Sequence, residues 1–533
     1  MIKYKNLTLF IVYFVFISIW IAFGYFSIGA LTDTFSDVYS AISSSLWEKF
    51  INAVPFIDIY RYRPFFFIFL KGITLLSLLF GISPQNFVII KLILIIFYFT
   101  TGFLVYKIIF ELNGNFYYAF LGFILTILYP NNLNSFFWTA GILELLVVTL
   151  FLSAILFKII FVKTNKLKYY VLSVICFILA LFTKEIALIY PFVGLIILII
   201  SFPRQTINKN NWQFYIDFLL LLMFLIIRLT IVLLQTNNNS IKHIVDLLPS
   251  IKSIGVIFLK SCFSLFIPFD YYQTLEGFSS FNLYILFYVL IALAMMILTS
   301  YRLPQKALIS SIIVFIISII PLIIAGYTRP QLILLSFCLV IITLLAQNAK
   351  FPKLLLLVLI IFWIYEGIKI EWYWKFSHTK FQRTIELLSK IDTEEKTTIV
   401  AGIPSRISQN YIADNIMFPY NLKKYGEFVI RDTIIDIPRV VYLSEESFEK
   451  KIFITKKNKD SYLLSCPEKG LFFYIPDSDS EIKKDVFENN FLKITVIKRN
   501  DYLKPSQLLL ELKRPDLKYF FMQPDCIINL REL

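Results

Sequence analysis

The sequence predicts a polytopic α-helical membrane protein with a soluble α+β domain at its C-terminal end. Three observations lead to this fold class. Of the 533 residues, 58% are hydrophobic and only 16% are charged. Apolar runs long enough to cross about 30 Å of hydrocarbon recur through residues 1–370. After residue 370 the chain becomes rich in Lys, Glu and Asp, with short alternating apolar runs.

The apolar runs predict about eleven transmembrane helices. The first run lacks a small-residue cleavage site after Ile28, so we expect a helix that stays in the membrane and not a cleaved signal peptide. The predicted helices cover approximately residues 7–28, 86–111, 116–132, 137–161, 168–183, 185–202, 213–234, 282–300, 307–325, 330–347 and 353–370.

Residues 65–82, FFFIFLKGITLLSLLFGI, are apolar enough to count as another span. The positive-inside rule argues against it: only if this segment does not cross do the later basic clusters face the cytoplasm. We therefore expect it to lie at the outer surface or to dip in, with Lys71 toward the headgroups. The inside positions are then Lys3, Lys5, Lys107, Lys158, Lys163, Lys166, Lys168, Arg204, Lys209, Arg302, Lys306, Lys350 and Lys353.

This topology divides the chain into a transmembrane domain, 1–370, and an extracytoplasmic domain, 371–533. The N-terminus is cytoplasmic, and the loops 29–85 and 235–281 lie outside. The second loop has an amphipathic pattern over 251–267. In the C-terminal domain, runs such as RVVYL and FLKITVI predict strands, and 378–391 predicts a helix.

The charge and the cysteine and histidine counts exclude several functions. The net charge of +15 is explained by short basic loops between spans, and no nucleic-acid-binding motif is present. Two histidines exclude a multi-histidine metal site. Cys466 and Cys526 lie in the outer domain, where both a disulfide and two free thiols are consistent with the sequence.

The first outer loop carries two groups of chemically capable residues. Asp33 and Asp37 lie four positions apart, on one face if the segment is helical. A close carboxylate pair suits a general base or a divalent-metal site, although a hydrated loop would contain the same residues. Arg61 and Arg63 precede Pro64. They could hold a lipid phosphate, or extend to the interface beside Tyr62.

Further ionisable residues fall within or next to the predicted spans. Charge at such depth usually faces a cavity or a partner. Several of these positions lie on the same side as the first outer loop, although the Lys184–Glu185 pair also fits a polar hairpin turn. The residues are Glu144, Lys184, Glu185, Arg228 and Arg329, with Asp270 and Glu276 in the second outer loop.

Five segments, in order, resemble the GT-C superfamily of membrane glycosyltransferases, which use polyprenyl-phosphate sugars. The likeness covers about residues 1–350 and is greatest to protein O-mannosyltransferases and bacterial aminoarabinose transferases. The segments are the acidic first loop, YRYRPFFFIFLKGITLLSLLFGISPQNF, YPNNLNSFFWTAGILELL, LFTKEIALIYPF and LKSCFSLFIPFDYY. The departures are acids four apart instead of adjacent, Ile142 where the family often has Arg, and only a loose match around Arg329.

The resemblance implies an inverting sugar transfer at the outer face of a bacterial plasma membrane, within the cell envelope. Asp37, which matches better than Asp33, would be the base, and Arg63 would contact the lipid phosphate. Arg61, Lys184, Glu185 and Arg329 would complete the substrate site, and a divalent metal at the aspartates is the one cofactor to consider. The donor would be a polyprenyl-phosphate-linked hexose or pentose. The acceptor would be a glycan, a lipid or a protein.

Two alternatives remain open from the residues alone. One is a flippase or transporter for lipid-linked glycans, which would need an inverted repeat or broken helices; the sequence shows no such repeat. The other is an oligosaccharide transferase or ligase of the same fold, which the sequence separates poorly from a single-sugar transferase.

Overall fold

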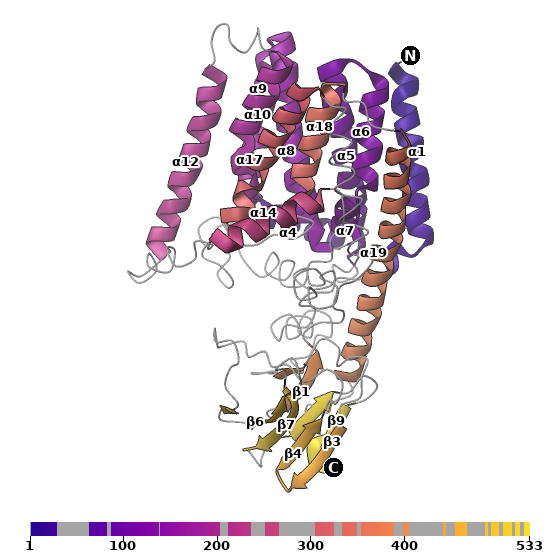
Figure 1. The fold of residues 1–533 in the computed structure, drawn as a ribbon, viewed down its shortest axis with the longest axis vertical. Coiled ribbons are helices and arrows are strands. Elements are labelled where there is room, and N and C mark those ends of the chain that lie inside the picture. Colours follow the sequence, from indigo (N-terminus) through magenta and orange to yellow (C-terminus); the bar gives the residue numbers. More distant parts are fainter. Residues whose placement is uncertain are drawn as a thin grey trace. The chain divides into compact units, whose positions relative to one another are not determined.

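The structure of the protein is a computed structural model. It describes residues 2–28, 63–82, 87–137, 139–202, 212–235, 251–265, 304–324, 333–348, 353–388, 398–404, 441–443, 453–465, 486–488, 492–499, 505–513, 518–522 and 527–533. The chain divides into a helical unit and a C-terminal β-rich unit that meet in the sequence between Trp372 and Tyr373. Each unit is considered by itself (Figure 1).

The first unit is a helical bundle whose long members are built from apolar runs. Its elements are α1 (Ile2–Ala22), η1 (Tyr25–Ser27), α4 (Pro64–Leu79), α5 (Val88–Asn113), α6 (Phe116–Leu128), α7 (Pro130–Phe137), η3 (Thr139–Gly141), α8 (Ile142–Thr164), α9 (Leu167–Leu181), η4 (Glu185–Ile189), α10 (Tyr190–Ser201), α12 (Trp212–Gln235), α14 (Ile251–Ser264), α17 (Gln305–Ile324), α18 (Leu334–Ala346) and α19 (Lys353–Leu388).

Three of the described helices, α5, α8 and α17, are long and apolar enough to cross a membrane. Shorter apolar helices surround them, including α6, α9, α10 and α18. Large apolar side chains remain exposed on the outside of the bundle, among them Phe14, Ile96 and Ile226. A soluble protein rarely exposes so much apolar surface, so these features agree with a membrane protein.

The bundle has two distinct ends. At one end, Asn113 of α5 donates to the carbonyl of Leu345 in α18 at 2.8 Å, and Lys163 of α8 pairs with Glu111 at 2.8 Å. We call this the basic end. It also contains the end of α10 and the start of α17. At the other end, Tyr25 stacks on Phe136 of α7 at 4.3 Å. We call this the site end. It also contains the starts of α5 and α8, and η4.

Helix α4 begins and ends at the site end. The amide of Phe65 donates to the carbonyl of Phe182 at 3.1 Å, which joins the start of α4 to the end of α9. Shortly after Ile82 the chain reaches Phe87 and enters α5, whose first turns contact η1. One face of α4 is buried, including Phe66 and Leu70, whereas Leu79 is 82% exposed. The helix therefore packs with one side against the bundle at the site end.

Small residues allow α5 and α6 to pack closely. A Cβ on Gly122 would overlap Cδ1 of Ile109, and one on Gly102 would lie 2.9 Å from Cγ2 of Ile127. Helix interfaces in membranes use such residues because backbones can then approach closely. The α5–α6–α8 packing supports the elements that form the site end.

Two helical elements differ from the sequence prediction. Residues 130–137 form the separate short helix α7, where we expected the end of one span and the start of the next. The last predicted span, 353–370, continues without a break as α19 to Leu388, so the helix expected at 378–391 belongs to α19. The predicted span 282–300 lies outside the described residues.

The boundary between the units falls within α19, and after that helix the described part of the C-terminal unit consists of two small sheets and a final 3-10 turn, η10 (Leu530–Glu532). One sheet has the order β2-β1-β8-β9 and is mixed; the other has the order β3-β4-β7-β6-β5 and is antiparallel. Tyr462, Leu508 and Leu510 are buried in the second sheet. The strands are β1 (Thr398–Pro404), β2 (Val441–Leu443), β3 (Phe453–Asn458), β4 (Ser461–Ser465), β5 (Val486–Glu488), β6 (Leu492–Arg499), β7 (Pro505–Leu512), β8 (Lys518–Met522) and β9 (Ile527–Asn529).

Candidate substrate site

Two ion pairs lie next to each other at the site end. Arg63 Nη2 donates to Glu185 Oε2 at 3.2 Å, and Lys184 Nζ donates to Glu144 Oε1. The four side chains are largely buried, with exposed fractions of 13% for Arg63, 23% for Glu185, 10% for Lys184 and 8% for Glu144. We call these four residues the ion-pair cluster. It joins three segments that are far apart in the sequence.

Local structure explains how each member is positioned. Arg63 precedes Pro64, which starts α4 because a proline at the first helical position loses no hydrogen bond. Lys184 is extended (φ −161°, ψ 145°) between α9 and η4, so Lys184 and Glu185 reach different partners. Glu144 lies in the first turn of α8, where the positive end of the helix dipole favours a carboxylate.

The electrostatics of the cluster are balanced between two cations and two carboxylates. Burial lowers the pKa of Lys184, and the negative charge of Glu144 opposes this shift. A guanidinium has five N–H donors, so one arginine can bind a carboxylate and a phosphate oxygen together. Arg63 therefore has suitable chemistry for holding a phosphate next to Glu185.

Lys91 is a buried cation that the sequence analysis did not single out. Its ammonium donates to the carbonyl of Tyr25 at 2.6 Å and lies 4.8 Å from the centre of that ring. In return the Tyr25 hydroxyl donates to the carbonyl of Lys91 at 3.2 Å. The sequence could have indicated this residue, because a lysine inside the apolar run 86–111 needs a partner. The contact fixes the turn from which the first outer loop leaves α1.

A second feature missed from the sequence is the polar surface of α7. Tyr129 donates to the carbonyl of Ser264 at 2.5 Å, and Asn131 donates to the same carbonyl at 3.0 Å. These bonds hold the end of α14 against α7. The amide oxygens of Asn131 and Asn132 are buried without a hydrogen-bond partner in the described part of the chain. In the sequence, the polar segment YPNNLNS between two apolar runs could have indicated this surface.

One predicted location is wrong. Lys158 was expected in a cytoplasmic loop, but it is buried in α8 and pairs with Asp217 of α12. Its ammonium lies 4.5 Å from the centre of the Phe214 ring. A buried lysine needs such a partner, because an isolated charge is costly in apolar surroundings. Because Lys158 lies near the end of the predicted span 137–161, nothing in the sequence indicated its ion pair with Asp217.

Of the predicted site residues, the structure brings Arg63, Lys184 and Glu185 together. The others, Asp33, Asp37, Arg61 and Arg329, lie outside the described residues, as do Asp270, Glu276, Cys466 and Cys526. Arg228 belongs to α12, but its side chain is not among those described. Within the described ranges, no three His, Cys, Asp or Glu side chains gather as metal ligands.

The sequence matches no protein-family model and no curated protein. The GT-C resemblance therefore rests on the five sequence segments.

Proposed function

We propose that the protein is an inverting glycosyltransferase that moves a sugar from a polyprenyl phosphate to an acceptor at the outer membrane face. The observation that carries the proposal is the ion-pair cluster. It puts Arg63, from the basic block before Pro64, in contact with the Lys-Glu turn of Lys184 and Glu185. These two segments are separate motifs of the GT-C resemblance, and they meet at the end of the bundle from which the first outer loop departs.

The proposed reaction is a single displacement. Asp37, or Asp33, removes the proton from the acceptor hydroxyl while the oxygen attacks the anomeric carbon. The bond from that carbon to the phosphate oxygen breaks, and the lipid phosphate leaves with the bonding electron pair. Arg63 stabilises the negative charge that grows on the leaving phosphate. Lys184 and Glu144 hold the turn against which Arg63 is positioned.

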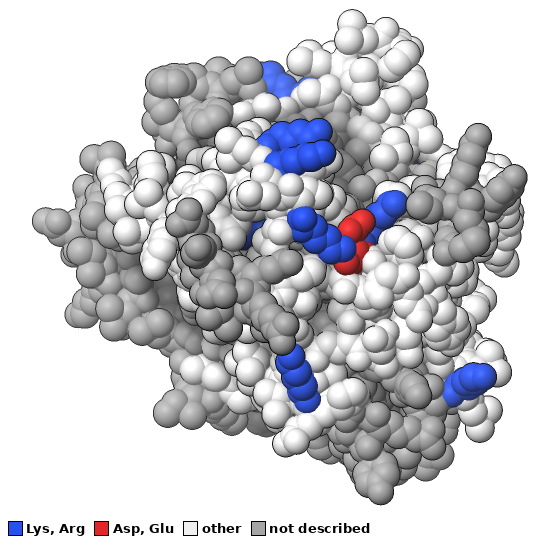
Figure 2. Space-filling model, turned by 90° about the horizontal axis from the view of Figure 1, so that it is seen from above, with Lys and Arg blue, Asp and Glu red and all other residues white. Residues whose placement is uncertain are grey.

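The distribution of charge supports an outer location for this site. At the basic end, the last turn of α8, the connection to α9 and the first turn of α9 contain Lys163, Lys166 and Lys168, whereas the segment between α6 and α8 at the site end, residues 129–141, contains neither Lys nor Arg. Seen from above, the basic end has several basic side chains spread over its described surface (Figure 2). The positive-inside rule assigns such an end to the cytoplasm. A lipid-linked donor would reach the opposite end by diffusing laterally in the outer leaflet.

The test is sugar transfer from polyprenyl-phosphate donors by the full chain in detergent. Replacing the base, Asp37→Asn or Asp33→Asn, is expected to lower kcat about 10² to 10⁴-fold. Arg63→Lys is expected to lower it about 10² to 10³-fold, because a point charge replaces the paired donors of the guanidinium. Lys168→Met, at the basic end, is the matched control and should keep full activity. Full activity of both aspartate variants would refute the assignment of the base.

A second candidate, a flippase for lipid-linked glycans, is favoured by one observation, the buried Lys158–Asp217 pair. Charged pairs inside helical bundles often line ion or substrate pathways. Reconstituted protein distinguishes the two functions. A transferase releases polyprenyl phosphate when given donor and acceptor, whereas a flippase moves the labelled donor between leaflets without breaking its glycosidic bond.

A further inference from the structure

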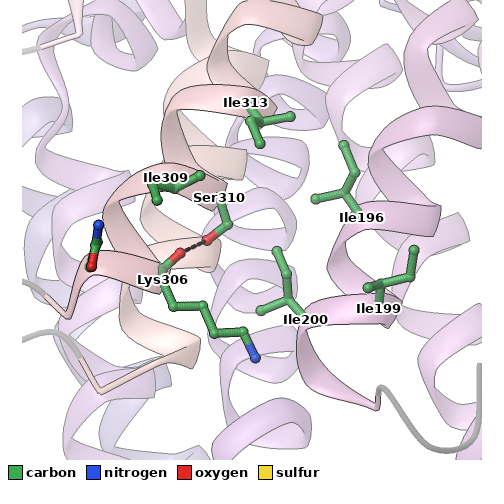
Figure 3. Close-up of a pocket in the computed structure, with 8 residues that line it drawn as sticks. Ile196, Ile199, Ile200, Lys306, Ile309, Ser310 and Ile313 are labelled. Atoms are coloured by element: carbon green, nitrogen blue, oxygen red, sulfur yellow. Dashed lines mark hydrogen bonds between the residues drawn. The ribbon is translucent and has the colours of Figure 1, made fainter.

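A hollow lies between α10 and α17, at the basic end and away from the ion-pair cluster. It has a volume of about 480 Å³, within the range of about 300–1,000 Å³ that is usual for small-molecule sites. It is lined by Ile196, Ile199, Ile200, Gln305, Lys306, Ile309, Ser310 and Ile313 (Figure 3).

The walls of the hollow are apolar and open to the outside of the bundle. Ile196 and Ile200 lie one turn apart on α10, and Ile309 and Ile313 lie one turn apart on α17, so the two pairs run along facing helices. Ile309 is 49% exposed and Ile313 is 43% exposed. Because α17 is apolar and long enough to cross a membrane, this opening would face lipid.

The one hydroxyl in the lining is already used by the protein. Ser310 donates to the carbonyl of Lys306 at 2.7 Å, the bond drawn in Figure 3, and accepts from Gln347 at 2.8 Å. A ligand would therefore gain little binding free energy from a hydrogen bond to Ser310. The inner part of the hollow therefore suits a hydrocarbon chain.

The end of the hollow has the opposite character. Lys306, in the first turn of α17, is exposed, and none of the ion pairs among the described residues includes it. Its side chain extends toward the α10 side of the hollow (Figure 3). The positive end of the α17 dipole is at the same place, and both favour an anion. A cation at the helix terminus with an apolar channel beneath it matches the two parts of an anionic lipid.

We propose that this hollow binds an anionic membrane phospholipid, with its phosphate at Lys306 and one acyl chain between α10 and α17. The occupant comes from the leaflet at the basic end, which is the opposite leaflet from the polyprenyl donor of the proposed reaction. The site is therefore independent of sugar transfer. A lipid bound here would fill the hollow between α10 and α17.

The experiment measures lipid binding to delipidated full-length protein in detergent, by native mass spectrometry and by thermal unfolding. Phosphatidylglycerol is expected to bind about fivefold more tightly than phosphatidylcholine, the ratio for one lysine near a membrane surface. In Lys306→Met this preference is expected to disappear. Lys168→Met, which removes an exposed charge from the same end but not from the hollow, should keep it.

A second pair of variants tests the acyl-chain channel. Ile309→Trp fills the hollow from an exposed position and is expected to weaken binding of both lipids, whereas Ile312→Trp, exposed on α17 but not in the lining, should not. Equal binding of the two lipids to the wild-type protein, or an unchanged preference in Lys306→Met, overturns the proposal. Tight binding of polyprenyl phosphate alone would also overturn it. None of these outcomes depends on transferase activity.

Discussion

Buried lysines are the most informative residues of the bundle. Lys158 and Lys184 each meet a carboxylate, whereas Lys91 meets a backbone carbonyl and an aromatic face. The Lys163–Glu111 pair, at 33% exposure for both side chains, lies in contrast at the surface. Because water screens the surface pair, the buried and exposed pairs should respond very differently to the loss of one partner.

Removing one partner of the Lys184–Glu144 pair should destabilise the bundle. Lys184→Met leaves the Glu144 carboxylate buried without its cation, which should lower the free energy of unfolding by about 3 kcal/mol. The double variant Lys184→Met with Glu144→Leu should recover most of this loss, because no uncompensated charge remains. Reversible unfolding in mixed detergent micelles measures both.

Lys163→Met is the control for this experiment, since its exposed pair should contribute about 1 kcal/mol or less. Equal losses for Lys184→Met and Lys163→Met would contradict the burial argument. So would a double variant that is less stable than Lys184→Met alone.

Sequence reasoning could name some of these residues but not their partners. Arg63, Glu144, Lys184 and Glu185 were identified because charge next to apolar runs is costly and therefore meaningful. That Arg63 meets Glu185, and Lys184 meets Glu144, depends on how α4, α8 and α9 pack. Hydropathy describes each run separately, so it contains no information about such pairings.

At the level of elements, the junction between α7 and α8 depends on Gly141. A Cβ there would overlap the carbonyl oxygen of Ser135 and would lie 2.7 Å from its carbonyl carbon. Backbone atoms cannot rotate away, so Gly141→Ala must displace α7 or the start of α8, which carries Glu144. We expect a loss of about 3 kcal/mol of stability and a large fall in the yield of monodisperse protein.

Gly194→Ala is the matched control. Gly194 lies inside α10, and a Cβ added to it would meet no atom within 4 Å. Alanine there should be neutral or should stabilise the helix by up to about 1 kcal/mol. Size-exclusion profiles of the two variants provide the comparison, and similar behaviour would contradict the steric argument.

Helix α12 is attached to its neighbours by a few polar contacts. Asp217 pairs with buried Lys158, and the Tyr170 hydroxyl donates to the carbonyl of Gln213 at 3.0 Å. These polar contacts attach α12 to α8 and α9. Asp217→Asn should therefore increase hydrogen exchange along α12 while α5 remains protected. Tyr215→Ala, at an exposed position on α12, is the control; equal exchange in the two variants would show that the pair does not hold α12.

The elements also show where prediction from sequence succeeds and fails. Long apolar runs such as α5, α8, α12 and α17 were found because hydropathy over about 20 residues is a strong signal. The short helix α7 was missed because its first and last residues were assigned to the predicted spans on either side, 116–132 and 137–161; its residues Asn131, Asn132 and Asn134 are all buried. The extension of α19 was missed because Glu371 and His378 marked a change of composition, which a helix can pass through without breaking.

For the whole molecule, the two ends of the helical unit differ in both charge and structure. The basic end carries the exposed lysines Lys163, Lys166, Lys168 and Lys306, and the proposed phospholipid site lies there. The site end carries the ion-pair cluster and the helices α4, α7 and α14, which are additional to the helices that run from one end of the bundle to the other. This asymmetry supports the proposed transferase over the alternative of a flippase, which would alternate between two equivalent faces.

We expect the basic end of the helical unit to face the cytoplasm and the site end to face outside. If the basic end is cytoplasmic, green fluorescent protein fused after Asn165, at that end, should fluoresce in a bacterial host. Alkaline phosphatase fused after Lys184, at the site end, or after Leu533 should be active, because that enzyme folds only outside the cytoplasm, where its disulfides form. The decisive position is Lys184, because α4 determines its side: if α4 crossed the membrane, the reporters at Asn165 and Lys184 would exchange their activities.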